Sequence, residues 1–151
     1  MSDFFTGLFA NKCLAAAAIA WTLAQVIKLP LEYLLHHEWN WHLLISAGGM
    51  PSSHSALVTA VSVAIGLTQG FNSPIFAVSC VLSLVVIYDA TGVRRHAGDQ
   101  ARVINLMIDE LLTGHPLAEK ELKEVLGHTP REVVAGIALG IIVGIVVVNL
   151  M

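Results

Sequence analysis

Long uncharged runs dominate the pattern of hydrophobic and polar positions along this chain. The 50 residues 39–88 contain no Asp, Glu, Lys or Arg, and the last 19 residues, 133–151, contain none either. An apolar run of about 20 residues can cross the roughly 30 Å hydrocarbon core of a bilayer as a helix. Because a spanning segment must satisfy its backbone polar groups internally, helices are expected rather than open strands. The pattern predicts an all-α, polytopic membrane helix bundle.

About four spanning helices are expected, with a buried loop before the second. The first covers about 13–27 and continues past Pro30 as an amphipathic stretch, 31–37. Segment 46–54 is rich in glycine, serine and proline, which predicts a loop whose Pro51 and serines open and cap the next helix. The remaining elements are a second helix over 52–67, a third over 74–88 whose pattern carries on towards 99–102, a short surface helix over 119–125 and a last helix over 131–150.

Composition supports one membrane-embedded domain over residues 1–151. Apolar residues make up 56% of the chain and charged residues 13%, whereas soluble domains carry about a quarter charged residues. A net charge of −3 gives no indication of a nucleic-acid partner. Cys13 and Cys80 both lie in apolar runs, so we interpret them as small buried hydrophobic residues.

The distribution of basic residues predicts the orientation. Lys and Arg concentrate in cytoplasmic segments of membrane proteins. Six of the eight basic residues lie between the third and last helices: Arg94, Arg95, Arg102, Lys120, Lys123 and Arg131. This places the segment in the cytoplasm, and Lys28, the 48–54 loop and the 88–100 segment then share that face. We therefore expect a multi-pass protein of the cell membrane with a composite polar site on one side.

The loop at Gly49–His54 has the features of an anion site. A glycine-bearing loop that leads into a helix presents free N–H groups and the positive end of the helix dipole, which together bind phosphate. Ser52 and Ser53 add hydroxyl donors, and His54 can exchange a proton near neutral pH. The alternative is an ordinary capped helix start with a satisfied histidine. Polar groups at membrane depth are costly, which favours the functional interpretation.

The second polar cluster follows the third apolar run. Asp89 ends that run and needs a partner, which Arg94 and Arg95 can supply. Paired guanidinium groups also match phosphate oxygens, and His96 is a candidate nucleophile or acid–base group beside them. The alternative is a basic anchor at a helix end, but that does not explain the acid, histidine, amide and glycines gathered in the same segment.

Three stretches resemble the type 2 phosphatidic acid phosphatases, and more closely their divergent branch, the acid phosphatase/vanadium-dependent haloperoxidase-related membrane proteins. They are Gly48–Ala56 (Gly-Gly-Met-Pro-Ser-Ser-His-Ser-Ala), Tyr88–Ala101 and Leu126–Pro130 (Leu-Gly-His-Thr-Pro). In the wider family a lysine and arginine motif binds phosphate, and the histidine after Pro-Ser protonates the leaving group. A later histidine attacks phosphorus, and a carboxylate four residues further on orients it.

The resemblance implies roles for particular residues of this chain. His54 is the expected general acid and His96 the expected nucleophile. The expected phosphate-binding residues are Lys28, Ser52, Ser53, Arg94, Arg95 and Gln100. Covalent catalysis of this kind needs no metal or cofactor.

The chain also departs from the wider family's pattern. No Arg-Pro follows Lys28, and one residue separates Arg94 from His96 where the wider family has five. Gln100 stands at the carboxylate position after His96, so Asp89 is kept as an alternative base or orienting group.

Three functions remain in competition. The first is a hydrolase that removes a phosphate or diphosphate from a lipid at the cytoplasmic face. The second is a non-catalytic binder or carrier of phosphorylated lipid. The third is a structural membrane protein whose polar groups pin the helices together. Gly136, Gly140 and Gly144 form a ridge on the last helix, which favours either a homodimer or close packing within the chain.

Overall fold

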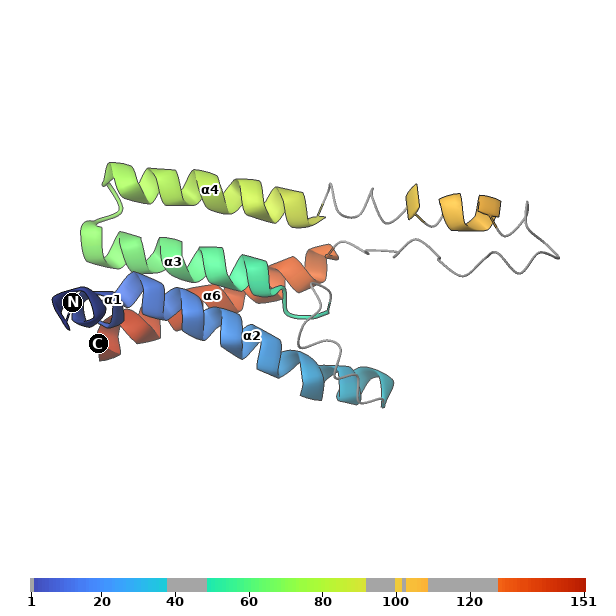
Figure 1. Ribbon diagram of the computed structural model, residues 1–151, viewed down its shortest axis with the longest axis horizontal. Helices are drawn as coiled ribbons and strands as arrows, with labels where there is room; N and C mark the ends of the chain where they lie inside the picture. The colour runs from blue at the N-terminus through green and yellow to red at the C-terminus, as the bar shows by residue number, and fades with distance from the viewer. Residues whose placement is uncertain (1, 38–48, 92–99, 102, 109–127) are drawn as a thin grey trace.

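The computed structural model describes residues 2–37, 49–91, 100–101, 103–108 and 128–151, and all its labelled elements are helices (Figure 1). The elements are α1 (Ser2–Phe9), α2 (Lys12–His36), α3 (Ser53–Gln69), α4 (Pro74–Thr91) and α6 (Pro130–Leu150). Residues 100–101 and 103–108 are helical too. The predicted helical membrane bundle is confirmed, and α2 continues through Pro30 as expected. The expected helix over 119–125 lies outside the described residues.

Three of these helices are long and apolar enough to cross a membrane: Lys12–Leu34, Pro74–Thr91 and Pro130–Leu150. The sequence predicted about four. The remaining candidate, α3, has 17 residues and lies between α4 on one side and the α2/α6 pair on the other (Figure 1). It packs against all three of these helices, so α3 is the central element of the bundle.

Small residues spaced four apart form the contact between α3 and α6. The glycine ridge of α6 lies against the backbone of the fully buried Ala56 and Ala60 on α3 and against the Cβ atoms of Ser55, Thr59 and Val63 beside them. A Cβ added at Gly140 would lie 2.6 Å from the carbonyl oxygen of Ala56. Such ridges let helix backbones approach closely. The contacts advance along both helices in the same order, so α3 and α6 run parallel.

The glycine ridge therefore has a role within the chain. Gly136 lies against Ser52 and Ser55, and Gly144 lies against Ala60 and Val63. Of the two alternatives for this ridge, the structure shows intramolecular packing. A homodimer stays a prediction, and it would have to use a surface other than this ridge.

Helix α2 runs antiparallel to α3 and α6. The Lys12 ammonium, at its start, donates to the carbonyl oxygen of Val148 near the end of α6 (3.1 Å). Cys13 lies beside Thr68 near the end of α3, with Sγ and Oγ1 3.8 Å apart. The later part of α2 consequently lies beside the N-termini of α3 and α6, and this arrangement brings Lys28 to that end of the bundle.

Candidate functional site at the N-termini of α3 and α6

Helix α3 begins with a buried serine cap. The Ser52 hydroxyl accepts hydrogen bonds from the Ser55 N–H (3.3 Å) and the Ser55 hydroxyl (3.1 Å). Gly49 precedes it with φ +86°, a conformation that favours glycine. Ser52, Ser53 and Ser55 are all buried. The predicted capped helix start is present, and its hydroxyl groups lie inside the protein rather than in solvent.

A backbone hydrogen bond joins the starts of α3 and α6. The Ser52 N–H donates to the carbonyl oxygen of Glu132 (2.9 Å). Thr129 caps α6 by accepting from the Glu132 N–H at 3.5 Å. Because the two helices are parallel and start side by side, the positive ends of both helix dipoles lie at one end of the bundle. An anion is stabilised at such a place.

His128 and Glu132 form a close side-chain pair at this end. His128 Nδ1 lies 2.7 Å from Glu132 Oε2, and the histidine is 3% exposed. Its backbone N–H donates to the carbonyl oxygen of Ala90 at the end of α4 (3.0 Å), which fixes the residue between α4 and α6. His128 Nε2 is buried and has no hydrogen-bond partner among the residues that the structure describes. Buried polar atoms normally have one, so this nitrogen is a candidate for contact with a ligand.

His54 lies next to His128. The two ring centroids are 6.2 Å apart and the ring planes are inclined at 58°. His54 belongs to the first turn of α3, whereas His128 immediately precedes the α6 cap. Two imidazole rings from different helices are thus held next to each other at this end of the bundle.

Lys28 adds a positive charge to the cluster. It continues the buried face of α2 that carries Ala16, Ala20 and Ala24, and it is 1% exposed. Its ammonium is near enough to Glu132 for the two charges to attract each other. A buried charge is costly unless it is paired. The cluster of the buried Lys28, Ser52, Ser53 and His128 and the half-buried His54 and Glu132 is called the polar cluster below.

Comparison with known proteins identifies the family of this chain. The model of the Divergent PAP2 family matches residues 9–143, a range that contains every residue of the polar cluster. The chain belongs to the Divergent PAP2 family. A relative from Bacillus subtilis (strain 168), described as the uncharacterized membrane protein YuiD, is 46% identical over 150 residues, with 92% of this chain and 95% of the relative covered. No solved structure matches the chain significantly.

Four of the residues expected to act in this Divergent PAP2 protein come together: Lys28, Ser52, Ser53 and His54. Asp89 is half-buried and adjoins Ala90, whose carbonyl oxygen receives the His128 N–H. Gln100 is exposed in its own helical segment. Three further predicted site residues lie outside the described residues, and their roles stay predictions: Arg94, Arg95 and His96.

His128 and Glu132 were not among the predicted site residues. His128 belongs to the Leu126–Pro130 stretch that carries the family resemblance, but it was given no role there. The signal that could have identified the pair is its spacing. Glu132 follows His128 by four residues, which is the separation that the resemblance expects between the nucleophile and its orienting carboxylate, and His96 has Gln100 at that place.

The described residues contain no group of three or more His, Cys, Asp or Glu side chains that could hold a metal ion. The prediction that the chemistry requires no metal stays a prediction. The polar cluster has one carboxylate, two imidazoles, an ammonium and two helix N-termini, a composition that favours phosphate and proton transfer.

Proposed function

We propose that this Divergent PAP2 protein is a lipid phosphatase that hydrolyses a phosphate monoester or diphosphate at the membrane surface. The observation that carries the proposal is the His128–Glu132 pair. The Glu132 carboxylate holds Nδ1 of His128. The other ring nitrogen of His128, Nε2, is buried and has no hydrogen-bond partner among the described residues, and the His128 ring lies next to His54.

His128 is the nucleophile in this proposal, in place of the predicted His96. When the Glu132 carboxylate accepts a hydrogen bond from Nδ1–H, the lone pair of the neutral imidazole is on Nε2. That nitrogen attacks phosphorus and forms a P–N bond as the bond from phosphorus to the leaving oxygen breaks. The electron pair goes to the leaving oxygen, and His54 supplies the proton that turns it into an alcohol or a phosphate group.

Water completes the reaction. His54, now neutral, takes a proton from a water molecule as the water oxygen attacks phosphorus. The P–N bond breaks, its electrons return to Nε2, and inorganic phosphate leaves. The Glu132 carboxylate stabilises the positive charge that His128 carries while it is phosphorylated.

Lys28 and the two helix N-termini bind the phosphate oxygens in this account. Positive charge that is fixed before the reaction stabilises the transition state without reorganisation. The predicted contributions of Arg94 and Arg95 would add guanidinium donors to the same group. Asp89 lies beside the Ala90–His128 contact and would act on the position of His128 rather than on phosphorus.

The test is phosphate release by the purified, detergent-solubilised protein from a panel of lipid phosphates and diphosphates. His128→Asn and His54→Asn are compared with His37→Asn, a matched change at an exposed histidine outside the polar cluster. We expect release to be lost in the first two variants and kept in the third, with all three folded by thermal melt.

Release that continues in folded His128→Asn would contradict the proposal. Lipid phosphate that binds to the wild type but is not hydrolysed would instead favour a carrier.

A further inference from the structure

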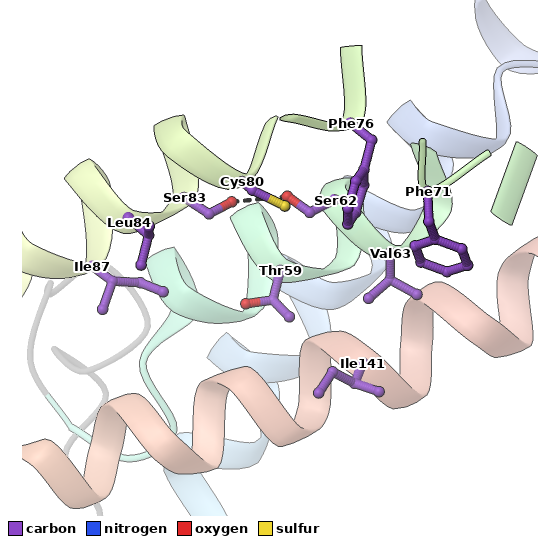
Figure 2. A pocket seen from close by; sticks show the side chains of 10 residues that line it. All are labelled: Thr59, Ser62, Val63, Phe71, Phe76, Cys80, Ser83, Leu84, Ile87 and Ile141. Carbon is purple, nitrogen blue, oxygen red and sulfur yellow. Dashed lines mark hydrogen bonds between the residues drawn. The ribbon is translucent and has the colours of Figure 1, made fainter. Parts of the chain in front are cut away.

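A second feature of the bundle is an apolar groove of about 380 Å³ between α3, α4 and α6. Figure 2 shows its lining residues, with Thr59 and Val63 on α3, Phe76, Cys80 and Ile87 on α4, and Ile141 on α6. The two central hydroxyl groups of the groove, on Ser62 and Ser83, are 2.9 Å apart and bond to each other. The one hydroxyl hydrogen of Ser83 is shared between the carbonyl oxygens of Val58 (3.1 Å) and Ser79 (2.8 Å), which leaves Ser62 to donate to Ser83. The walls therefore present hydrocarbon.

One end of this groove lies next to the polar cluster. On α4, Ile87 precedes Ala90 by three residues, and Ala90 accepts the His128 N–H. On α3, Thr59 follows the buried Ser55 by four residues. A rise of about 4.5–6 Å along each helix thus separates the groove from Ala90 and Ser55, which contact the polar cluster residues His128 and Ser52.

Two aromatic rings close the opposite end. Phe71 and Phe76 meet edge to face with ring centroids 5.2 Å apart, and Gly66 leaves the room that the Phe71 ring occupies. Figure 2 shows these rings at the far end of the groove from Ile87. Phe76 and Ile87 are eleven residues apart on α4, so the groove is roughly 16 Å long at 1.5 Å per residue.

We propose that this groove holds the hydrocarbon chain of the substrate while its phosphate lies at His128. The inference rests on the proposed function and names the substrate class: a lipid phosphate with one long chain. Continuity with the polar cluster selects this occupant. A chain attached to a phosphate at His128 enters the groove at Ile87 and ends at the Phe71–Phe76 pair.

A bulky residue in the groove tests the proposal. Cys80 lines the groove, whereas its neighbour Val81 is 61% exposed on the same helix and does not line it. Cys80→Trp is compared with Val81→Trp, using hexadecyl phosphate and the chainless p-nitrophenyl phosphate as substrates. Cys80→Phe replaces Cys80→Trp if the larger residue prevents folding.

We expect Cys80→Trp to lower kcat/KM for hexadecyl phosphate by about tenfold or more, a typical cost of a misfit in an apolar substrate pocket. Hydrolysis of p-nitrophenyl phosphate should stay within about twofold of wild type, and Val81→Trp should change neither substrate, since it alters only a surface residue. Equal losses for the two substrates, or no loss for hexadecyl phosphate, would overturn the groove assignment.

A photo-cross-linking experiment tests the groove assignment independently of the proposed phosphatase activity. A hexadecyl phosphate with a diazirine near the chain end is cross-linked to the protein, and its attachment is located by peptide mass spectrometry. We expect attachment near Phe71 and Phe76 that excess hexadecyl phosphate and Cys80→Trp both abolish. If the wild type hydrolyses nothing but labels in this way, only the phosphatase proposal fails. Labelling that is spread over exposed faces and is indifferent to Cys80→Trp would overturn the groove.

Discussion

The bundle has two regions with different packing. Where α2, α3 and α6 meet, buried alanines of α2 and α3 pack with two valines of α6, and the backbones of α3 and α6 approach so closely that a Cβ at Gly140 does not fit. Helix α4 instead joins α3 through the Ser62–Ser83 hydrogen bond, with an apolar groove beside it. The first region holds the polar cluster and the second holds the proposed chain site. The close packing of α2, α3 and α6 holds the reacting groups rigidly, whereas the groove beside α4 leaves room for hydrocarbon chains of different lengths.

The largest effect is expected from Glu132→Gln, which alters chemistry in the tightly packed region. The amide oxygen of Gln can still accept a hydrogen bond from His128, so the fold should be kept. It has no negative charge to stabilise the imidazolium, so we expect phosphate release to fall by about 10²–10⁴-fold. Steady-state kinetics with a lipid phosphate measure this. A rate within a few-fold of wild type would remove Glu132 from the mechanism.

Gly140→Leu tests the packing of the same region. Its side chain would collide with the backbone of α3 at Ala56 and with Thr59, so we expect destabilisation of about 3 kcal/mol or more. Gly7→Leu is the matched control, because nothing lies within 4 Å of a Cβ added there. Thermal melts of the two variants in the same detergent should differ clearly. Similar melting temperatures would show that α3 and α6 do not depend on this contact.

A smaller effect is expected from Ser83→Ala on the α4 side. It removes the hydroxyl that bonds to Ser62 and to the Val58 carbonyl oxygen of α3. Interhelical hydrogen bonds in membrane proteins contribute about 0.6 kcal/mol each on average, so we expect a loss of stability of about 1 kcal/mol in a denaturant titration. Leu82→Ala, at a 59% exposed position of the same helix, is the control for general effects of truncation. A loss of several kcal/mol would contradict the loose attachment of α4.

The helices and the shared polar end were predictable from sequence because both depend on regular signals. Uncharged runs predicted the membrane-spanning helices, and the serines at 52 and 53 predicted the start of α3. Lys28 was expected on the same face as the 48–54 loop from the count of membrane crossings, and its ammonium lies near Glu132, whose carbonyl oxygen accepts the Ser52 N–H. The central position of α3 was not predictable, because an uncharged run predicts a spanning helix whether its faces pack against protein or against lipid.

The place of the His128–Glu132 pair in the candidate site could not be predicted from sequence alone. Residues 28, 52–54 and 128–132 are far apart in the chain, and they meet because small-residue faces on three helices determine how closely those helices pack. A histidine and a glutamate before an apolar run are also typical of an ordinary helix start. The role of the glycine ridge was also open, because its spacing is typical both of a homodimer contact and of packing within one chain. The structure shows that it packs against α3.

The most direct test of the central claim is to locate the phosphoryl group on the protein during turnover. Wild type that is hydrolysing a lipid phosphate is quenched in alkali, which preserves phosphohistidine, and its peptides are analysed by mass spectrometry. We expect phosphate on His128 in the wild type and none in His128→Asn. Phosphate on His96, or steady hydrolysis with His128 never modified, would contradict it.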